Sequence, residues 1–178
     1  MTKNRGLLLD RDGVINIDHN YVGTVDRFDF MPDLFPFLRQ ARDLGYRLAV
    51  LTNQSGVGRG KFSAQDYQNL TEHMLGCLRR EQIEVELVLA CFEHPQAPLP
   101  AYARESFWRK PNQGMVLEAA RRLNLDLARS LFLGDSLRDM EAGHAAGVGH
   151  CLWLTEKTES PSPHFKIIRN FKEAEEYL

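Results

Sequence analysis

The chain has 178 residues, of which 43% are hydrophobic and 26% are charged, and its formal net charge is -2. This length suits one well-buried domain and is short for two, and the composition excludes general disorder. The small net charge gives no reason to expect nucleic acid as a partner, and no segment approaches the apolar length of a membrane span. We therefore expect a single domain over residues 1–178, a monomer that acts on a small molecule.

Three cysteines, Cys77, Cys91 and Cys151, are scattered without the spacing of a disulfide framework. Such a set is typical of free thiols in a reducing compartment. The apolar run at residues 7–9 is far too short for the core of a signal peptide. These features predict a cytoplasmic protein.

The first predicted strand, residues 7–9, ends in two acids, Asp10 and Asp12, and Gly13 then lets the chain turn. The carboxyl ends of parallel strands open onto the crevice where ligands bind, so we expect Asp10 to face a site. Two neighbouring carboxylates are unfavourable unless a cation or a proton separates them. An isolated Asp-x-Asp pair is usually a solvated turn, so its meaning depends on the rest of the chain.

Residues 14–31 alternate between polar and aromatic types and predict a small flap over the site. A helix is expected from Asp33, as its cap, to about residue 44, and a second strand over residues 46–52 ends in Thr52. Ser63 with an acid three residues later resembles a capping box that opens a helix to about residue 81.

The remaining chain continues to alternate between strands and helices. The expected segments are a strand at 85–91, a loop at 92–108, a helix at about 113–123 capped by Asn112, a strand at 130–133, a helix ending near 146, a strand at 150–154, a polar loop at 155–164 and a closing helix at 171–178. Strands that are apolar throughout and alternate with helices indicate a parallel sheet covered on both faces. The fold class predicted is therefore α/β, a Rossmann-like three-layer sandwich.

Polar side chains gather at the predicted carboxyl ends of the strands: Asp10, Asp12, Thr52, Asn53, Arg109, Lys110, Asp135 and Asp139. Magnesium prefers oxygen ligands and bridges to phosphate, so Asp10, Asp135 and a backbone carbonyl near Asp12 are expected to bind Mg²⁺. A lysine and a hydroxyl can hold the other phosphoryl oxygens, and a carboxylate can attack phosphorus. Asp139 has two interpretations: it supports the metal ligands, or it is an early-helix charge favoured by the helix dipole.

Four segments, Asp10-Arg11-Asp12-Gly13, Leu51-Thr52-Asn53, Lys110 ahead of a helix, and 134–139, resemble in order and spacing the four motifs of the haloacid dehalogenase (HAD) superfamily of phosphohydrolases. More narrowly, residues 10–16, 18–22, 52–60, 94–96 and 109–111 resemble the D-glycero-D-manno-heptose 1,7-bisphosphate phosphatase family, a relative of the histidinol-phosphate phosphatase domain. The resemblance implies a magnesium-dependent enzyme without a large cap domain. It would remove the 7-phosphate in the synthesis of nucleotide-activated heptose for surface polysaccharide.

The same resemblance implies roles for individual residues. Asp10 would be the nucleophile, Asp12 the general acid and base, and Thr52 and Lys110 would steady the phosphoryl group. Magnesium would be bound by Asp10, by the carbonyl of Asp12 and by Asp135. Substrate contacts are expected from Asp18, His19, Asn20, Tyr21, Thr52, Asn53, Gln54, Ser55, Arg59, Arg109 and Lys110.

One segment departs from the family. The family often carries a zinc loop after the third strand, and its four ligand positions fall here on Cys91, Glu93, Ser106 and Trp108. Serine and tryptophan cannot replace thiolates on zinc, so we do not expect zinc. We expect Phe107 and Trp108 to hold the loop by burying apolar area.

Two alternatives stay open. The chain could be a phosphatase for histidinol phosphate or another small phosphomonoester, although the flap residues favour a heptose bisphosphate. It could also be a catalytically silent binding module on the same fold, because fold does not fix function. The intact set Asp10, Asp12, Lys110 and Asp135 argues against the silent module.

Overall fold

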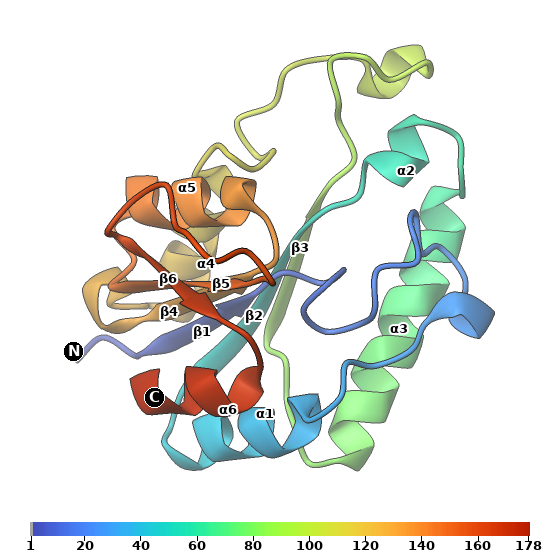
Figure 1. Ribbon diagram of the computed structural model, residues 1–178. Coiled ribbons are helices and arrows are strands. Elements are labelled where there is room, and N and C mark those ends of the chain that lie inside the picture. Colours follow the sequence, from blue (N-terminus) through green and yellow to red (C-terminus); the bar gives the residue numbers. More distant parts are fainter. Residues whose placement is uncertain (1) are drawn as a thin grey trace.

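A six-stranded parallel sheet forms the centre of the protein (Figure 1). The computed structural model describes residues 2–178, and Met1, with which the predicted domain begins, lies outside them. The strand order is β3-β2-β1-β4-β5-β6, and every neighbouring pair is parallel. The strands are β1 (Gly6–Leu9), β2 (Arg47–Asn53), β3 (Leu87–Cys91), β4 (Leu131–Gly134), β5 (His150–Leu154) and β6 (Phe165–Ile168).

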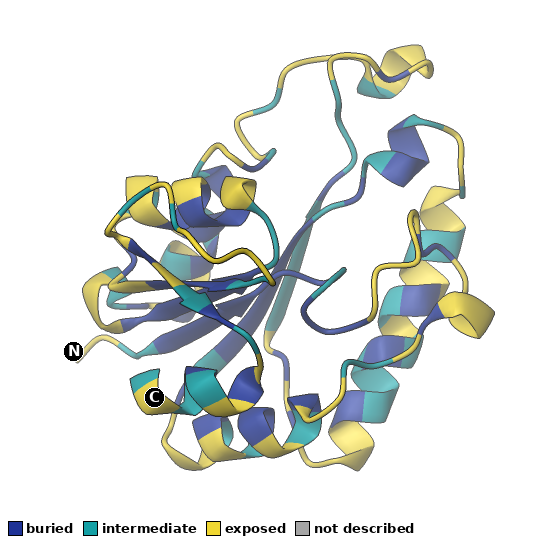
Figure 2. Ribbon diagram, in the orientation of Figure 1, coloured by how far each residue is buried: buried dark blue, intermediate teal, exposed yellow. Residues whose placement is uncertain are grey.

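Helices cover both faces of the sheet, which confirms the predicted three-layer α/β sandwich (Figure 1). The helices α1 (Leu34–Asp43), α3 (Ala64–Arg80) and α6 (Phe171–Ala174) pack on one face, and α4 (Gly114–Leu123) and α5 (Leu137–Ala146) pack on the other. Alternation along β1 divides its side chains between the two cores: Leu7 and Leu9 face α1 and α3, whereas Leu8 faces α4. Figure 2 shows the central strands β1, β2 and β4 as almost continuously buried.

The site is positioned by the order of the strands. β1 lies between β2, the next strand along the chain, and β4, which is reached only after β3 and three further α-helices. The connections therefore leave β1 in opposite directions, and in open parallel sheets ligands bind at such a switch point, beyond the carboxyl ends. The residues that follow β1, β2 and β4 must meet there.

Two excursions leave this edge of the sheet. The flap, residues 14–31, contains one short 3-10 helix, η1 (Val25–Arg27), and its buried residues Val14, Ile15 and Val22 anchor it to the core. This confirms a small flap in place of a large cap within residues 2–178. The loop at 92–108 contains η2 (Pro100–Tyr102) and projects away from the sheet (Figure 1). No helix in residues 2–178 has the length and apolar character needed to cross a bilayer.

The predicted packing of the loop is wrong. Phe107 is 57% exposed and Trp108 is 42% exposed, so neither ring is buried against the core. Polar contacts close the base of the loop instead: Arg104 donates to Glu93 over 2.8 Å, and the Cys91 thiol donates to the other carboxylate oxygen of Glu93 over 3.1 Å.

Several local predictions also differ from the structure. The edge strand β6 was not predicted, and neither was the short helix α2 (Ser55–Gly58). Asp33 precedes α1 but makes no capping bond, because its backbone is left-handed (φ 60°), whereas a capping residue is usually extended. Asn112 does not cap α4, since its amide donates to the carbonyl of Ser106. The capping box of Ser63 and Asp66 at α3 is confirmed.

Candidate active site

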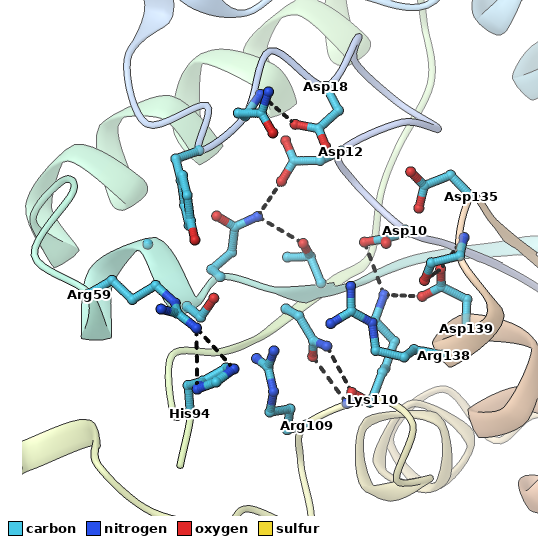
Figure 3. Close-up of a pocket in the computed structure, with 18 residues that line it drawn as sticks. Asp10, Asp12, Asp18, Arg59, His94, Arg109, Lys110, Asp135, Arg138 and Asp139 are labelled. Atoms are coloured by element: carbon cyan, nitrogen blue, oxygen red, sulfur yellow. Dashed lines mark hydrogen bonds and ion pairs between the residues drawn. The ribbon is translucent and has the colours of Figure 1, made fainter. Parts of the chain in front are cut away.

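Three carboxylates meet beyond β1 and β4. Ligand oxygens of Asp10, Asp135 and Asp139 all lie within 4.8 Å of one another (Figure 3). Asp10 follows β1 and Asp135 follows β4, and these strands are neighbours; the Asp10 N–H donates to the carbonyl of Leu133 over 2.9 Å. Asp139 joins the cluster from the first turn of α5. The structure thus brings together acids that are far apart in the sequence.

The backbone around Asp135 is closely packed. Gly13 has a left-handed conformation (φ 79°), and a Cβ atom there would lie 2.2 Å from Asp135 Oδ2, so only glycine allows this approach. On the other side, the indole N–H of Trp153 donates to the carbonyl of Asp135 over 2.8 Å. The turn after Asp12 and a residue of β5 therefore fix this carboxylate in place.

Lys110 is the cation of the cluster and is buried, with 1% of its surface exposed. Its Nζ lies 3.0 Å from Asp10 Oδ1 and 2.6 Å from Asp139 Oδ1, and it donates to the carbonyl of Leu51 over 2.6 Å. Burial by itself would lower the pKa of Lys110, but the charges of Asp10 and Asp139 outweigh it and raise the pKa. Lys110 is therefore charged.

One ammonium group does not balance three carboxylates. Burial raises the pKa of Asp10 to about 8, with Lys110 opposing the shift and Asp139 and Asp135 adding to it. Burial, and then the charge of Asp139, raises the pKa of Asp135 to about 7. A divalent cation between these oxygens would remove the repulsion, and oxygen ligands are those that magnesium prefers. The residues fit a magnesium ion.

Asp12 points away from this cluster and is held by three side chains. Arg11 Nη2 lies 2.9 Å from each oxygen of the Asp12 carboxylate, Asn16 Nδ2 donates to Oδ1 over 3.0 Å, and Gln54 Nε2 donates to Oδ2 over 2.7 Å. Arg11 is 1% exposed, and its Nη2 also donates to the carbonyl of Val22 in the flap over 2.6 Å. Sequence patterns predict no role for Arg11 or Asn16; the available signal is their position, Arg11 inside the first motif and Asn16 three residues after it.

A cavity of about 330 Å³ opens beside the acids (Figure 3). Its lining contains nearly all the residues proposed from the sequence: Asp10, Asp12, Asp18, Asn20, Tyr21, Thr52, Asn53, Gln54, Ser55, Arg59, Arg109, Lys110, Asp135 and Asp139. His19 is not part of the lining and pairs with the exposed Asp29 at 2.9 Å. In the flap, Asn20 (φ 59°) and Tyr21 (φ 52°) are both left-handed, which turns the chain sharply over the cavity.

Four cationic or basic side chains also line this cavity: Arg59, His94 and Arg109 lie away from the acids, and Arg138 lies beside Lys110 and Asp139 (Figure 3). Arg59 Nη2 lies 3.1 Å from His94 Nε2. Burial, and then the charges of Arg138 and Arg59, lower the pKa of Arg109. Among residues 2–178, no carboxylate lies within ion-pair distance of Arg59, Arg109 or Arg138. We refer to these four residues as the arginine cluster.

Sequence patterns do not indicate Arg138, and they give His94 no substrate role. The signal for Arg138 was its position in the first turn of the helix after Asp135, which places it at the same edge of the sheet. An adjoining cavity of about 400 Å³ is lined by His94, Arg109, Lys110 and Arg138, together with the carboxylate of Glu105, so the cationic residues border both cavities.

Comparison with known proteins gives the same picture as the geometry. The HAD-hydrolase-like family model matches residues 107–174. The D-glycero-alpha-D-manno-heptose-1,7-bisphosphate 7-phosphatase of Burkholderia mallei is 42% identical over 158 residues, which is 89% of this chain and 84% of that protein. The chain belongs to the heptose bisphosphate phosphatase family of the HAD superfamily.

Solved structures of similar phosphatases have the same fold as this chain. A HAD-like phosphatase from Mesorhizobium loti has a TM-score of 0.89 and 36% identity, covering 98% of this chain and 84% of that one. The D,D-heptose 1,7-bisphosphate phosphatase of B. bronchiseptica, complexed with magnesium and phosphate, has a TM-score of 0.84 and 26% identity, covering 97% and 96%.

The zinc loop expected of the heptose bisphosphate phosphatase family does not fit this chain. Cys91 and Glu93 are hydrogen-bonded to each other, and the Ser106 hydroxyl accepts from the backbone N–H of Trp108 over 3.3 Å. Trp108 offers no ligand atom, so two of the four positions lack a zinc donor. These residues therefore do not form a zinc site, and the reaction below is described without zinc.

Proposed function

We propose that this protein hydrolyses the 7-phosphate of a D-glycero-D-manno-heptose 1,7-bisphosphate. The observation that carries the proposal is one cavity lined both by a carboxylate cluster with a buried lysine and by the arginine cluster, whose guanidinium groups have no carboxylate partner within ion-pair distance among residues 2–178. The carboxylates and the lysine suit phosphoryl transfer, and the arginine cluster suits another anionic group on the same small substrate.

In the first step an oxygen of the Asp10 carboxylate attacks phosphorus. The bond from phosphorus to the sugar oxygen breaks, and Asp12 gives its proton to that oxygen. Thr52 and Lys110 donate hydrogen bonds to the phosphoryl oxygens as charge develops on them. The products of this step are the free sugar hydroxyl and a phosphorylated Asp10.

In the second step water attacks the phosphorus of the aspartyl phosphate. Asp12, now a carboxylate, takes a proton from the water, the bond from phosphorus to Asp10 breaks, and inorganic phosphate leaves. When bound by Asp10, Asp135 and the Asp12 carbonyl, magnesium would neutralise negative charge on the acids and the phosphate. Asp139 supports this site through its contact with Lys110.

The arginine cluster favours a bisphosphate over histidinol phosphate. Three guanidinium groups without carboxylate partners repel one another, and a second phosphate would neutralise them. Histidinol phosphate instead carries no second anionic group, and its ammonium group would be repelled by the same cluster. A heptose product that keeps its 1-phosphate has the group that nucleotide activation of a sugar requires. The cytoplasmic monomer stays a prediction.

The experiment is phosphate release from the two anomers of the heptose bisphosphate, from heptose 7-phosphate and from histidinol phosphate. We expect a bisphosphate to have the highest kcat/KM. Arg138→Met should lower the ratio of kcat/KM for the bisphosphate to kcat/KM for heptose 7-phosphate at least about tenfold, because one charge-assisted contact is lost. Arg129→Met is the control, because Arg129 is an exposed arginine before the amino end of β4, whereas the site lies beyond its carboxyl end. Equal kcat/KM for histidinol phosphate and the bisphosphates would overturn the assignment.

The nucleophile is tested separately. Asp10→Asn should abolish phosphate release while circular dichroism shows the fold unchanged, because an amide cannot attack phosphorus. Undiminished turnover would rule out the aspartyl-phosphate mechanism.

A further inference from the structure

Two amide side chains at the end of β2, Asn53 and Gln54, are turned towards the protein rather than towards open space. Side chains two residues apart lie on the same side of a strand, so Thr52 and Gln54 face one way and Asn53 faces the other. The strand ends at Asn53, and the Gln54 N–H still bonds to the carbonyl of Cys91 over 2.7 Å, so both amides stand on a rigid support.

The Asn53 amide bonds to the backbone of a residue 57 positions away. Asn53 Nδ2 donates to the carbonyl of Lys110 over 2.9 Å, and the Lys110 N–H donates to Asn53 Oδ1 over 3.1 Å. Lys110 follows the long loop at 92–108 and precedes α4, so no strand or helix bonds its backbone. Asn53 thus supplies the two backbone hydrogen bonds that a neighbouring strand would otherwise give to Lys110.

This contact extends to the reacting centre. Because the Lys110 backbone is fixed to β2, its side chain can run inward and place Nζ between Asp10 and Asp139, with a further bond to the carbonyl of Leu51 in the same strand. Both the start and the end of the lysine are therefore attached to β2.

The Gln54 amide is 3% exposed and joins two other groups of the site. Its Nε2 donates to Asp12 Oδ2 over 2.7 Å and to Thr52 Oγ1 over 2.9 Å. Arg11 holds the same carboxylate from the other side, so Asp12 is clamped between a guanidinium and an amide.

We propose that Asn53 and Gln54 are positioning residues: Asn53 sets the place of Lys110, and Gln54 sets the places of Asp12 and Thr52. The roles of Lys110 and Asp12 rest on the function proposed above, and both amides were expected from the sequence to bind substrate. The geometry assigns them to the enzyme's own reacting groups instead.

The two roles predict different kinetics. A lost substrate contact raises KM, whereas misplacement of a group that acts only in the transition state lowers kcat. We expect Asn53→Ala and Gln54→Ala each to lower kcat about tenfold or more, with KM changed by less than about twofold. Asn69→Ala, which removes an exposed asparagine of α3, is the matched control and should change neither constant.

Double-mutant cycles test whether each amide acts through its partner. If Asn53 acts through Lys110, Asn53→Ala should cost less than about twofold in a Lys110→Met background, and Gln54→Ala should cost equally little in an Asp12→Asn background. p-Nitrophenyl phosphate is the substrate for these cycles, so they remain valid if the natural substrate is not a heptose bisphosphate. A raised KM with unchanged kcat, or the full cost in both backgrounds, would overturn the proposal.

A binding measurement covers variants whose turnover is too slow to measure. By calorimetry with inorganic phosphate and magnesium, Asn53→Ala should change the dissociation constant of phosphate by less than about twofold, both in the otherwise native protein and when Lys110 is already methionine. Equal weakening in both proteins would mean that Asn53 contacts the phosphate itself, and the proposal would be wrong. Thermal unfolding of each variant separates these effects from a loss of folding.

Discussion

Two helices of this protein begin with the same sequence pattern, a serine followed three residues later by aspartate, and the two places have different uses. At α3, the Ser63 hydroxyl accepts from the Asp66 N–H over 3.0 Å, and Asp66 accepts from Ser63. At α5, Asp139 accepts from the N–H and the hydroxyl of Ser136, but its own N–H donates to the serine carbonyl. Asp66 lies at the surface, whereas Asp139 is fully buried against Lys110.

The difference shows that the same serine–aspartate pattern can stabilise a helix start and can also hold a side chain of the active site. Both aspartates satisfy backbone groups at a helix start, as the pattern predicts. At Asp139 one carboxylate oxygen bonds to Ser136, and the other contacts Lys110 Nζ at 2.6 Å. The two interpretations that the sequence left open for this residue, a helix-start charge and a support of the metal site, are therefore compatible in one side chain.

The sharpest test compares the two acids directly. Asp139→Asn should lower phosphatase turnover about 10- to 100-fold, because Lys110 loses a charged partner and the acid cluster loses a member. Asp66→Asn should leave turnover unchanged. Steady-state phosphate release measures both variants, and similar turnover of the two would contradict the distinction.

Magnesium should bind at the carboxylate cluster beside the start of α5 and not at the start of α3. At about 100 times its dissociation constant, magnesium should add about 2.7 kcal/mol to the free energy of unfolding of the native protein. Asp66→Asn should keep this stabilisation, and Asp135→Asn should lose most of it. Thermal melts with magnesium and with a chelator provide the measurement; an undiminished response of Asp135→Asn would exclude the carboxylate cluster as the magnesium site.

The serines should show the reverse ranking for stability. Ser63→Ala should cost about 1 kcal/mol, because the hydroxyl caps the N–H of Asp66. Ser136→Ala should cost less, since its hydroxyl caps no backbone N–H, yet it should lower turnover several-fold by freeing Asp139. Urea unfolding and phosphate release separate the two effects. A larger loss of turnover for Ser63→Ala would mean that α3 matters to the site.

The smallest expected effect concerns pH. Hydrogen bonds from the Ser63 side chain and backbone lower the pKa of Asp66 from its usual 3.8. A lowered pKa stabilises the folded protein above the unfolded value, and this contribution is lost as the pH falls through the folded value. The difference in urea midpoint between the native protein and Asp66→Asn should therefore shrink from about pH 6 to about pH 3. A constant difference would show that the charge of Asp66 does not stabilise α3.

The order of strands and helices and most site residues could be predicted, because they depend on local patterns. Apolar runs predicted five of the six strands, and the motifs predicted most of the residues that line the cavity. The edge strand β6 was missed because it has only four residues, of which the first and last are buried and the middle two are more exposed, too few for a clear period. Arg138 was missed because the other arginines that line the cavity, Arg59 and Arg109, come from other segments of the chain.

The sequence by itself determined the α/β class, the strand ends that carry polar groups and the assignment of the chain to the HAD phosphatases. These depend on hydrophobic periodicity, turn chemistry and short motifs, which act over a few residues. Only the tertiary structure decided what each polar side chain faces. It turned Asn53 onto Lys110 and Gln54 onto Asp12, left Phe107 and Trp108 exposed, and gathered three arginines without carboxylate partners. The reason is physical: a hydrogen bond or a Coulomb interaction depends on distance in space, and the strand order sets those distances between residues remote in the chain.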